Sequence, residues 1–320
     1  MPDTRLTTAQ KQTYAEEGFV IIRGFLDPAE LADWRRCLDD AVSQRDGGGL
    51  ATDASSGKIP QWHPEHGAGL ASTADMATRS VVDVAVAGDD KRINGSRIFT
   101  QRVNLWMTSP SMRRKMLDPQ LGRMVAELTG VDGVRIWHDQ TLIKEPWANP
   151  TALHVDNPNW GYDSHQATSI WVALDDVTAE NGALCFLPRS HKVAALGVRA
   201  GGAGSGNVAD HIFEVYPSLA TQTPVIATMR AGDCSFHSGM LAHGAGANMS
   251  AGRRRAMTCA YMPDGCRWNG VQNVLPGGYI QSIKIGDLLN DDWLNPLIFH
   301  RDPAKGLSVE KIGKVYQPRL

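Results

Sequence analysis

The stretch Ala152-Leu-His-Val-Asp-Asn-Pro-Asn-Trp160 contains a histidine and an aspartate separated by one residue. In an extended strand, residues i and i+2 point to the same face. We therefore expect a short strand end to aim His154 and Asp156 at one point in space. Two such side chains do not complete a catalytic metal site, so the chain must supply a third ligand from another segment.

Two histidines downstream compete for this third position. His237 lies inside an apolar run, which is typical of a histidine in the core. His243 opens a Gly-rich turn, where the backbone can approach a ligand closely. We therefore favour His243, with His154 and Asp156, as the metal-binding and catalytic set. Two histidines and one carboxylate on one face of a metal form the facial triad of non-haem Fe(II) oxygenases.

The composition narrows the class of protein. The chain has 320 residues, 42% of them hydrophobic, so it can bury the core of one large domain or two ordinary ones. A net charge of −2 gives no reason to expect nucleic acid, and the apolar runs are too short to span a membrane. The beginning of the chain lacks the pattern of a signal peptide. The scattered cysteines predict neither disulfides nor structural zinc, so we expect a reducing cytoplasm.

The first part of the chain, residues 1–130, is expected to be mainly helical. Capping residues and apolar spacing predict helices at 7–18, from Pro28 onward and within 109–128, and strands at 19–22 and 97–106. Residues 47–95 show little periodicity and are expected to be irregular.

From residue 131 to 264 the chain is expected to form the β-rich core. Runs of β-branched and apolar residues predict strands at 134–144, 168–174, 183–187, 225–229, 234–237 and 253–261. Short antiparallel strands at this spacing are typical of a sandwich or a double-sheet jelly roll. We expect one domain over 1–320, mainly β with flanking helices at its N-terminal side, and a C-terminal extension over 265–320. A Gly- and Ala-rich loop is expected at 195–208.

Three adjacent arginines, Arg253 to Arg255, follow the candidate third ligand. Alternation along a strand sends Arg254 to the face opposite its two neighbours. An arginine that points inward can make bidentate bonds to a carboxylate, which suits the far end of a 2-oxo acid.

Several further motifs now carry a family resemblance, which runs from Glu16 to about Asp264. They are Glu16-Glu-Gly-Phe-Val-Ile-Ile-Arg-Gly24, Asp139-Gln140 with Lys144, His154-x-Asp156, Trp171-Val-Ala-Leu-Asp-Asp176, Pro188-Arg-Ser-His191 and His243-Gly before the arginine-rich strand. In this order the chain resembles the phytanoyl-CoA dioxygenase family of Fe(II)- and 2-oxoglutarate-dependent oxygenases, which also includes ectoine hydroxylase. The resemblance implies a double-stranded β-helix, the cupin-like jelly roll.

The resemblance also implies the cofactors, the reaction and further site residues. Fe(II) would be held by the triad, and 2-oxoglutarate would be converted to succinate and CO2 while a small-molecule C–H bond is hydroxylated or otherwise oxidised. The family's 2-oxoglutarate arginine follows the distal histidine at the spacing that selects Arg254. Trp171 matches a tryptophan of the cofactor pocket, and Gln140 and Lys144 are expected to bind the cofactor with it.

Alternative functions differ in what they require of these residues. A radical halogenase replaces the carboxylate ligand with a small residue, and Asp156 argues against that. A β-helix domain that only binds a ligand needs no complete triad, and a zinc hydrolase leaves Arg254 without a task. The sequence shows no clear basic cluster for the phosphates of CoA, so a small metabolite is preferred over an acyl-CoA thioester.

Overall fold

The computed structural model describes residues 5–43, 100–199, 208–308 and 312. The segment 47–95, expected to be irregular, and most of the Gly-rich part of the 195–208 loop lie outside these ranges. Within them, no helix is long and apolar enough to cross a membrane.

The N-terminal elements form where their capping residues predict them. Helix α1 (Thr8–Glu17) begins with a capping box between Thr7 and Gln10 and ends at Gly18, whose φ of 84° is left-handed. Strand β1 (Phe19–Ile22) follows directly. Helix α2 (Pro28–Ser43) starts behind Asp27, whose carboxylate accepts the backbone N–H of Glu30.

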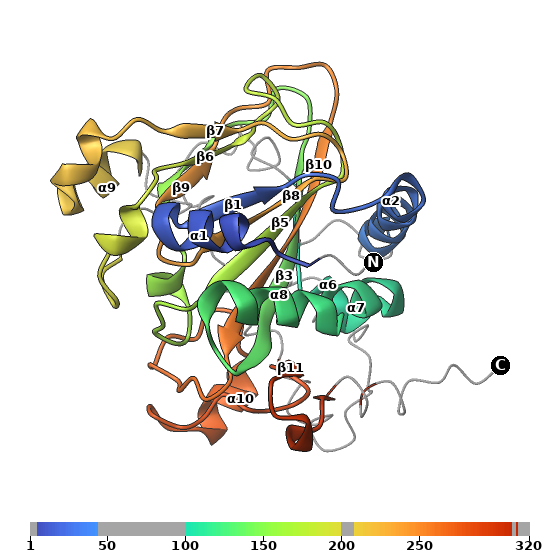
Figure 1. The fold of residues 1–320 in the computed structure, drawn as a ribbon, viewed down its shortest axis with the longest axis vertical. Helices are drawn as coiled ribbons and strands as arrows, with labels where there is room; N and C mark the ends of the chain where they lie inside the picture. Colours follow the sequence, from blue (N-terminus) through green and yellow to red (C-terminus); the bar gives the residue numbers. More distant parts are fainter. Residues whose placement is uncertain (1–4, 44–99, 200–207, 309–311, 313–320) are drawn as a thin grey trace.

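Two antiparallel sheets make up the β-rich part of the chain (Figure 1). The larger has the order β1-β8-β5-β10-β3-β11, with β2 paired to β3, and the smaller has the order β4-β9-β6-β7. The larger contains β2 (Thr100–Val103), β3 (Gly133–Lys144), β5 (Thr168–Ala173), β8 (Cys234–Ser238), β10 (Arg254–Pro263) and β11 (Leu297–His300). The smaller contains β4 (Thr151–His154), β6 (Leu184–Phe186), β7 (Val225–Ala227) and β9 (His243–Ala245). This is the predicted double-sheet jelly roll.

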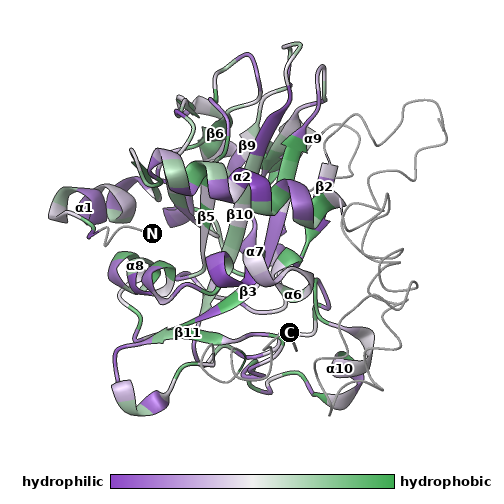
Figure 2. Cartoon of the chain, turned by 90° about the vertical axis from the view of Figure 1, so that its right-hand side faces the viewer, coloured by the Kyte–Doolittle hydropathy of each residue, from purple (hydrophilic) through white to green (hydrophobic). Residues whose placement is uncertain are grey.

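Helices cover the face of the larger sheet that points away from the smaller one (Figures 1 and 2). The main core lies between these helices and the larger sheet. The helices contribute Trp34, Leu38, Trp106, Met112, Leu121 and Met124, and the strands contribute Ile170, Val172, Phe236 and Met257. The remaining helices are α6 (Leu105–Thr108), α7 (Pro110–Met116), α8 (Pro119–Thr129), α9 (Val208–Val215) and α10 (Gly277–Ser282), with 3-10 turns at Asn157–Asn159, Ser190–Lys192, Pro217–Thr221 and Pro303–Lys305. Because helices cover one face of the larger sheet, a cavity can form only on its other face, toward the smaller sheet.

Several elements differ from the sequence prediction, and two of them change the larger sheet. The strand expected over 97–106 ends at Val103, because Asn104 adopts a left-handed φ of 58° and α6 begins at once. The buried carboxylate of Asp139 accepts the first backbone N–H groups of that helix, at 2.6 Å from Leu105 and 2.9 Å from Trp106. In the C-terminal extension, β11 pairs with β3 and widens the sheet, although its apolar run was not predicted as a strand.

Candidate active site

The two histidines of the triad lie side by side on neighbouring strands of the smaller sheet. His154 is the last residue of β4 and is the direct cross-strand partner of His243, the first residue of β9. Their ring centroids are 4.3 Å apart. A Cβ on Gly244 would lie 2.7 Å from the backbone oxygen of Thr151, so this glycine allows the close approach of the two strands. The pairing thus brings together two histidines from segments far apart in the chain.

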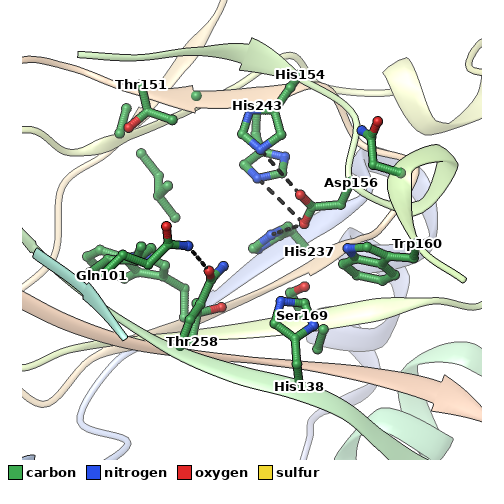
Figure 3. A pocket seen from close by; sticks show the side chains of 18 of the residues that line it. Gln101, His138, Thr151, His154, Asp156, Trp160, Ser169, His237, His243 and Thr258 are labelled. Atoms are coloured by element: carbon green, nitrogen blue, oxygen red, sulfur yellow. Dashed lines mark hydrogen bonds and ion pairs between the residues drawn. The ribbon is translucent and has the colours of Figure 1, made fainter. Parts of the chain in front are cut away.

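Asp156 reaches the same point by a turn rather than along a strand. Its backbone is right-handed helical, with φ −72° and ψ −58°, and it opens a 3-10 turn. The expected extended geometry for His154-Val-Asp156 is therefore wrong, since β4 ends before the aspartate. The carboxylate nevertheless lies 3.2 Å from His154 Nε2 and 3.8 Å from His243 Nε2 (Figure 3). One ligand atom from each of the three residues lies within 4.8 Å of the others.

Hydrogen bonds fix the orientation of both histidine rings. His154 Nδ1 lies 2.9 Å from the backbone oxygen of Ala152, and His243 Nδ1 lies 2.9 Å from that of Leu241. Because a carbonyl oxygen only accepts, each Nδ1 carries a hydrogen, and Nε2 is left as the nitrogen that can bind a metal. Metal-binding histidines are commonly held in this way, with the second nitrogen donating to a carbonyl. The donor set and its orientation therefore fit Fe(II).

Electrostatics favour the ionised form of Asp156 and the neutral form of His243. Burial raises the pKa of Asp156, but His243, His154 and His237 outweigh it and lower the pKa well below the usual range. Burial lowers the pKa of His243 to about 4. Burial also lowers the pKa of His154, yet its hydrogen bond to Asp156 prevails and raises it. At neutral pH the site offers an ionised carboxylate.

His237 is not an ordinary core histidine. It lies in β8 on the cavity-facing side of the larger sheet, with Nε2 3.9 Å from an oxygen of Asp156. Its ring centroid is 4.6 Å from that of His243, and Phe186 packs 5.5 Å away. Burial lowers its pKa to about 3, so it is neutral. It borders the triad, whereas the sequence placed it in the core.

A single cavity of about 200 Å³ contains the triad and the predicted cofactor residues. Arg254 is 2% exposed, and its guanidinium lies 5.2 Å from the ring centre of Trp171. It donates to the backbone oxygens of Leu142 at 3.2 Å and Gly182 at 3.0 Å. Arg254 forms no ion pair with a carboxylate of the described residues. Burial lowers its pKa to about 10, so it stays charged at neutral pH.

Lys144 and Gln140 lie on the neighbouring strand β3 and line the same cavity. Lys144 is the cross-strand partner of Arg254, and its ammonium donates to the backbone oxygen of Asn149 at 2.6 Å. Burial, with a smaller effect of Arg254, lowers its pKa to about 7. Gln140 is hydrogen-bonded to Gln101 of β2. One end of the cavity is therefore cationic.

The two flanking arginines point away from the cavity. Arg253 lies 3.4 Å from Asp39, and Arg255 lies 2.8 Å from Asp39 and 2.8 Å from Asp175. Arg255 connects β10 to helix α2 and to the loop after β5, and Arg253, just before β10, contacts α2.

Comparisons with known proteins agree with this geometry. A family model described as "Phytanoyl-CoA dioxygenase (PhyH)" matches residues 14–256. A probable phytanoyl-CoA dioxygenase of Caenorhabditis elegans is 36% identical over 277 residues, which make up 83% of this chain and 79% of that protein. The chain belongs to the phytanoyl-CoA dioxygenase family. The predicted family is thus confirmed, and membership makes the chain a 2-oxoglutarate-dependent dioxygenase with Fe(II) and 2-oxoglutarate as cofactors.

Solved structures support the fold of this family member. The α-ketoglutarate-dependent carbocyclase SnoK of nogalamycin biosynthesis aligns with a TM-score of 0.66 at 22% identity, over 93% of this chain and 98% of that chain. The epimerase SnoN, in complex with Fe3+, α-ketoglutarate and nogalamycin RO, aligns with a TM-score of 0.62 at 23% identity, over 91% and 97%. The predicted cupin-like fold is confirmed.

Several residues that line the cavity of this dioxygenase were not assigned to it from the sequence. They are Gln101, Thr151, Asn159, Trp160, Ser169, Thr258, Ala260, Asn273 and His138. His138 shares the inward face of β3 with Gln140 and Lys144, so strand alternation was the signal that pointed to it. Asn273 has no such signal, because it lies in the C-terminal extension and accepts a hydrogen bond from Trp137 Nε1 at 3.1 Å.

Proposed function

We propose that this dioxygenase oxidises an unactivated C–H bond of a small molecule, by hydroxylation or a related reaction, with release of succinate and CO2 from 2-oxoglutarate. In this assignment His154, Asp156 and His243 hold the metal, and Arg254, Lys144, Trp171 and Gln140 line the cofactor end. The bound metal and its cosubstrate supply the oxidising power, and the protein supplies ligation, orientation and a cavity screened from water.

The observation that carries the proposal is a buried arginine, in the same cavity as the triad, that pairs with no carboxylate among the residues the structure describes. A buried charge is costly unless it is paired and hydrogen-bonded. Carbonyl oxygens accept only part of the hydrogen-bonding capacity of Arg254, and its Nε has no partner among the described residues. A ligand carboxylate would satisfy it, and the far carboxylate of 2-oxoglutarate has that chemistry.

The residues around Arg254 support this placement of the carboxylate. Gly182 packs against Lys144, since a Cβ at Gly182 would lie 2.6 Å from Lys144 Cδ, and its carbonyl holds the guanidinium. The ring centre of Trp171 lies 5.2 Å from the guanidinium of Arg254. With both cations held in place, a carboxylate bound at this end would leave the rest of its molecule free to reach the triad.

The test is metal-dependent conversion of 2-oxoglutarate to succinate. Purified protein with Fe(II), oxygen and 2-oxoglutarate is incubated with a panel of small molecules, and succinate is measured. We expect some compounds to stimulate release, and Asp156→Ala to abolish it. Succinate release that is equal in Asp156→Ala and the wild type would refute the proposed site.

A further inference from the structure

The strand register divides the inward face of the larger sheet into rows of side chains. In one row, Ala260 of β10 is paired with His138 of β3 on one side and with Ser169 of β5 on the other, and Ser169 is paired with His237. Arg254 lies six positions from Ala260 along β10, which is roughly 20 Å at the usual rise per residue. The row of His138, Ala260, Ser169 and His237 therefore lies well away from the cationic end.

Figure 3 shows how this row meets the triad. His138 and Ser169 lie on the sheet below Asp156, and Trp160 stands beside them, whereas Gln101 and Thr151 lie on the other side of the cavity. The ring of Trp160 packs edge-on against His138 with centroids 5.8 Å apart. All four members of the row line the cavity. These groups border the metal ligands without being needed to hold the metal.

His138 is a buried polar side chain with one ring nitrogen that has no hydrogen-bond partner in the described part of the chain. It is 7% exposed and lines the cavity, and its Nδ1 is buried with no hydrogen-bond partner among the described residues. An orphaned acceptor is tolerated better than an orphaned N–H, so the neutral ring is expected to carry its hydrogen on Nε2. Nε2 is not among the buried atoms without a partner, so we expect a ligand in the cavity to meet the ring through that nitrogen. His138 thus offers a neutral donor, which matches a carbonyl or hydroxyl oxygen.

The charges of the side chains that line the cavity restrict the charge that a ligand can carry in this half. Of the described residues that line the cavity, only Arg254 and Lys144 are lysine or arginine, and both lie at the opposite end. Next to His138, the charged side chain is the carboxylate of Asp156, a proposed metal ligand. An anionic group placed here would lose its hydration beside the carboxylate of Asp156, and no lysine or arginine among the described lining residues of this half would compensate it. The flat face of Trp160 instead favours an apolar ring.

We propose that the half of the cavity formed by His138, Ser169 and Trp160 is the substrate subsite, and that it takes an uncharged cyclic molecule bearing a hydroxyl or carbonyl oxygen. The ring packs against Trp160, and the oxygen accepts a hydrogen bond from His138. This inference rests on the proposed function for the position of the reacting end. It extends that function by naming the substrate class, and it disfavours an anionic carrier thioester in this half.

The experiment is calorimetric titration of the full chain, with Fe(II) and 2-oxoglutarate and without oxygen, using 2-naphthol as the neutral probe and 2-naphthoate as its anionic match. We expect 2-naphthol to bind and 2-naphthoate to bind at least roughly tenfold more weakly, because burial of an unpaired charge is costly. His138→Leu should weaken 2-naphthol binding by roughly 2- to 10-fold, the worth of one neutral hydrogen bond. His138→Gln, which keeps an N–H donor, should recover part of the loss.

His165→Leu is the matched control, because His165 is exposed in a nearby turn and does not line the cavity. If His138→Leu does not fold, Trp160→Leu and the comparison of the two probes still decide the question. Unchanged binding of 2-naphthol in both variants would overturn the proposal, and so would 2-naphthoate binding as tightly as 2-naphthol. The titration measures binding and not turnover. Repeating it without Fe(II) and 2-oxoglutarate therefore tests the subsite independently of the proposed function.

Discussion

Replacing Arg254 with alanine is the perturbation whose size follows most directly from the structure. Arg254 is buried, charged and free of carboxylate partners among the described residues, and it lines the cavity. Removing one partner of a buried, charge-assisted pair costs on the order of 2–5 kcal/mol. Because Lys144 remains beside the ligand carboxylate, we expect the lower part of this range, about 2–3 kcal/mol. That loss corresponds to roughly 30- to 150-fold weaker 2-oxoglutarate binding at 1.4 kcal/mol per tenfold.

The assay is titration of 2-oxoglutarate into anaerobic protein loaded with Fe(II). Arg254→Ala should still bind iron, because Arg254 is not one of the proposed metal ligands. Arg253→Ala is the matched control, since Arg253 is half-exposed and reaches only Asp39 outside the cavity. An Arg254→Ala protein that binds 2-oxoglutarate as tightly as the wild type, with a loss in Arg253→Ala instead, would refute the assigned role.

Three further predictions concern the metal and the second cation. Asp156→Ala should lose iron and activity, because it removes the only anionic ligand; iron content measured on the folded protein checks this. His243→Ala should lose iron, whereas His237→Ala should cost stability and keep iron in the folded fraction; the reverse outcome would make His237 the third ligand. Burial holds the pKa of Lys144 at about 7, so its ammonium is charged below that pH and neutral above it. Affinity for 2-oxoglutarate should therefore fall as the pH rises above about 7, and Lys144→Met, titrated over the same range, should lose this dependence.

The inward position of Arg254 could be predicted because a strand has a strict period of two. The spacing from His243 and the alternation of side chains along a strand together select Arg254 from three adjacent arginines. The same rule placed Lys144 and Gln140 on the face that lines the cavity. Local signals likewise predicted α1, whose capping box and terminal glycine are both present in the sequence.

Other features depend on contacts that no local pattern reveals. Asp156 leaves the strand for a 3-10 turn held by the hydrogen bond from Asn157 N–H to the Gly239 oxygen at 2.8 Å, a contact between distant segments. Strand β11 forms because β3 offers it an edge. His237 follows an apolar run in the sequence, and only the pairing of β8 with β5 shows that it faces the cavity. Long-range packing, rather than propensity, decided each of these.

The visible absorption spectrum of the anaerobic protein with Fe(II) and 2-oxoglutarate tests the proposed metal site directly. If His154, Asp156 and His243 hold Fe(II) with room for a chelating 2-oxo acid, adding 2-oxoglutarate should produce the charge-transfer band of an Fe(II)–2-oxo acid chelate. The band should saturate at one 2-oxoglutarate per chain and be absent from His243→Ala. A wild-type protein without this band, or a His243→Ala protein with an undiminished band, would show that these three residues do not hold the metal as proposed.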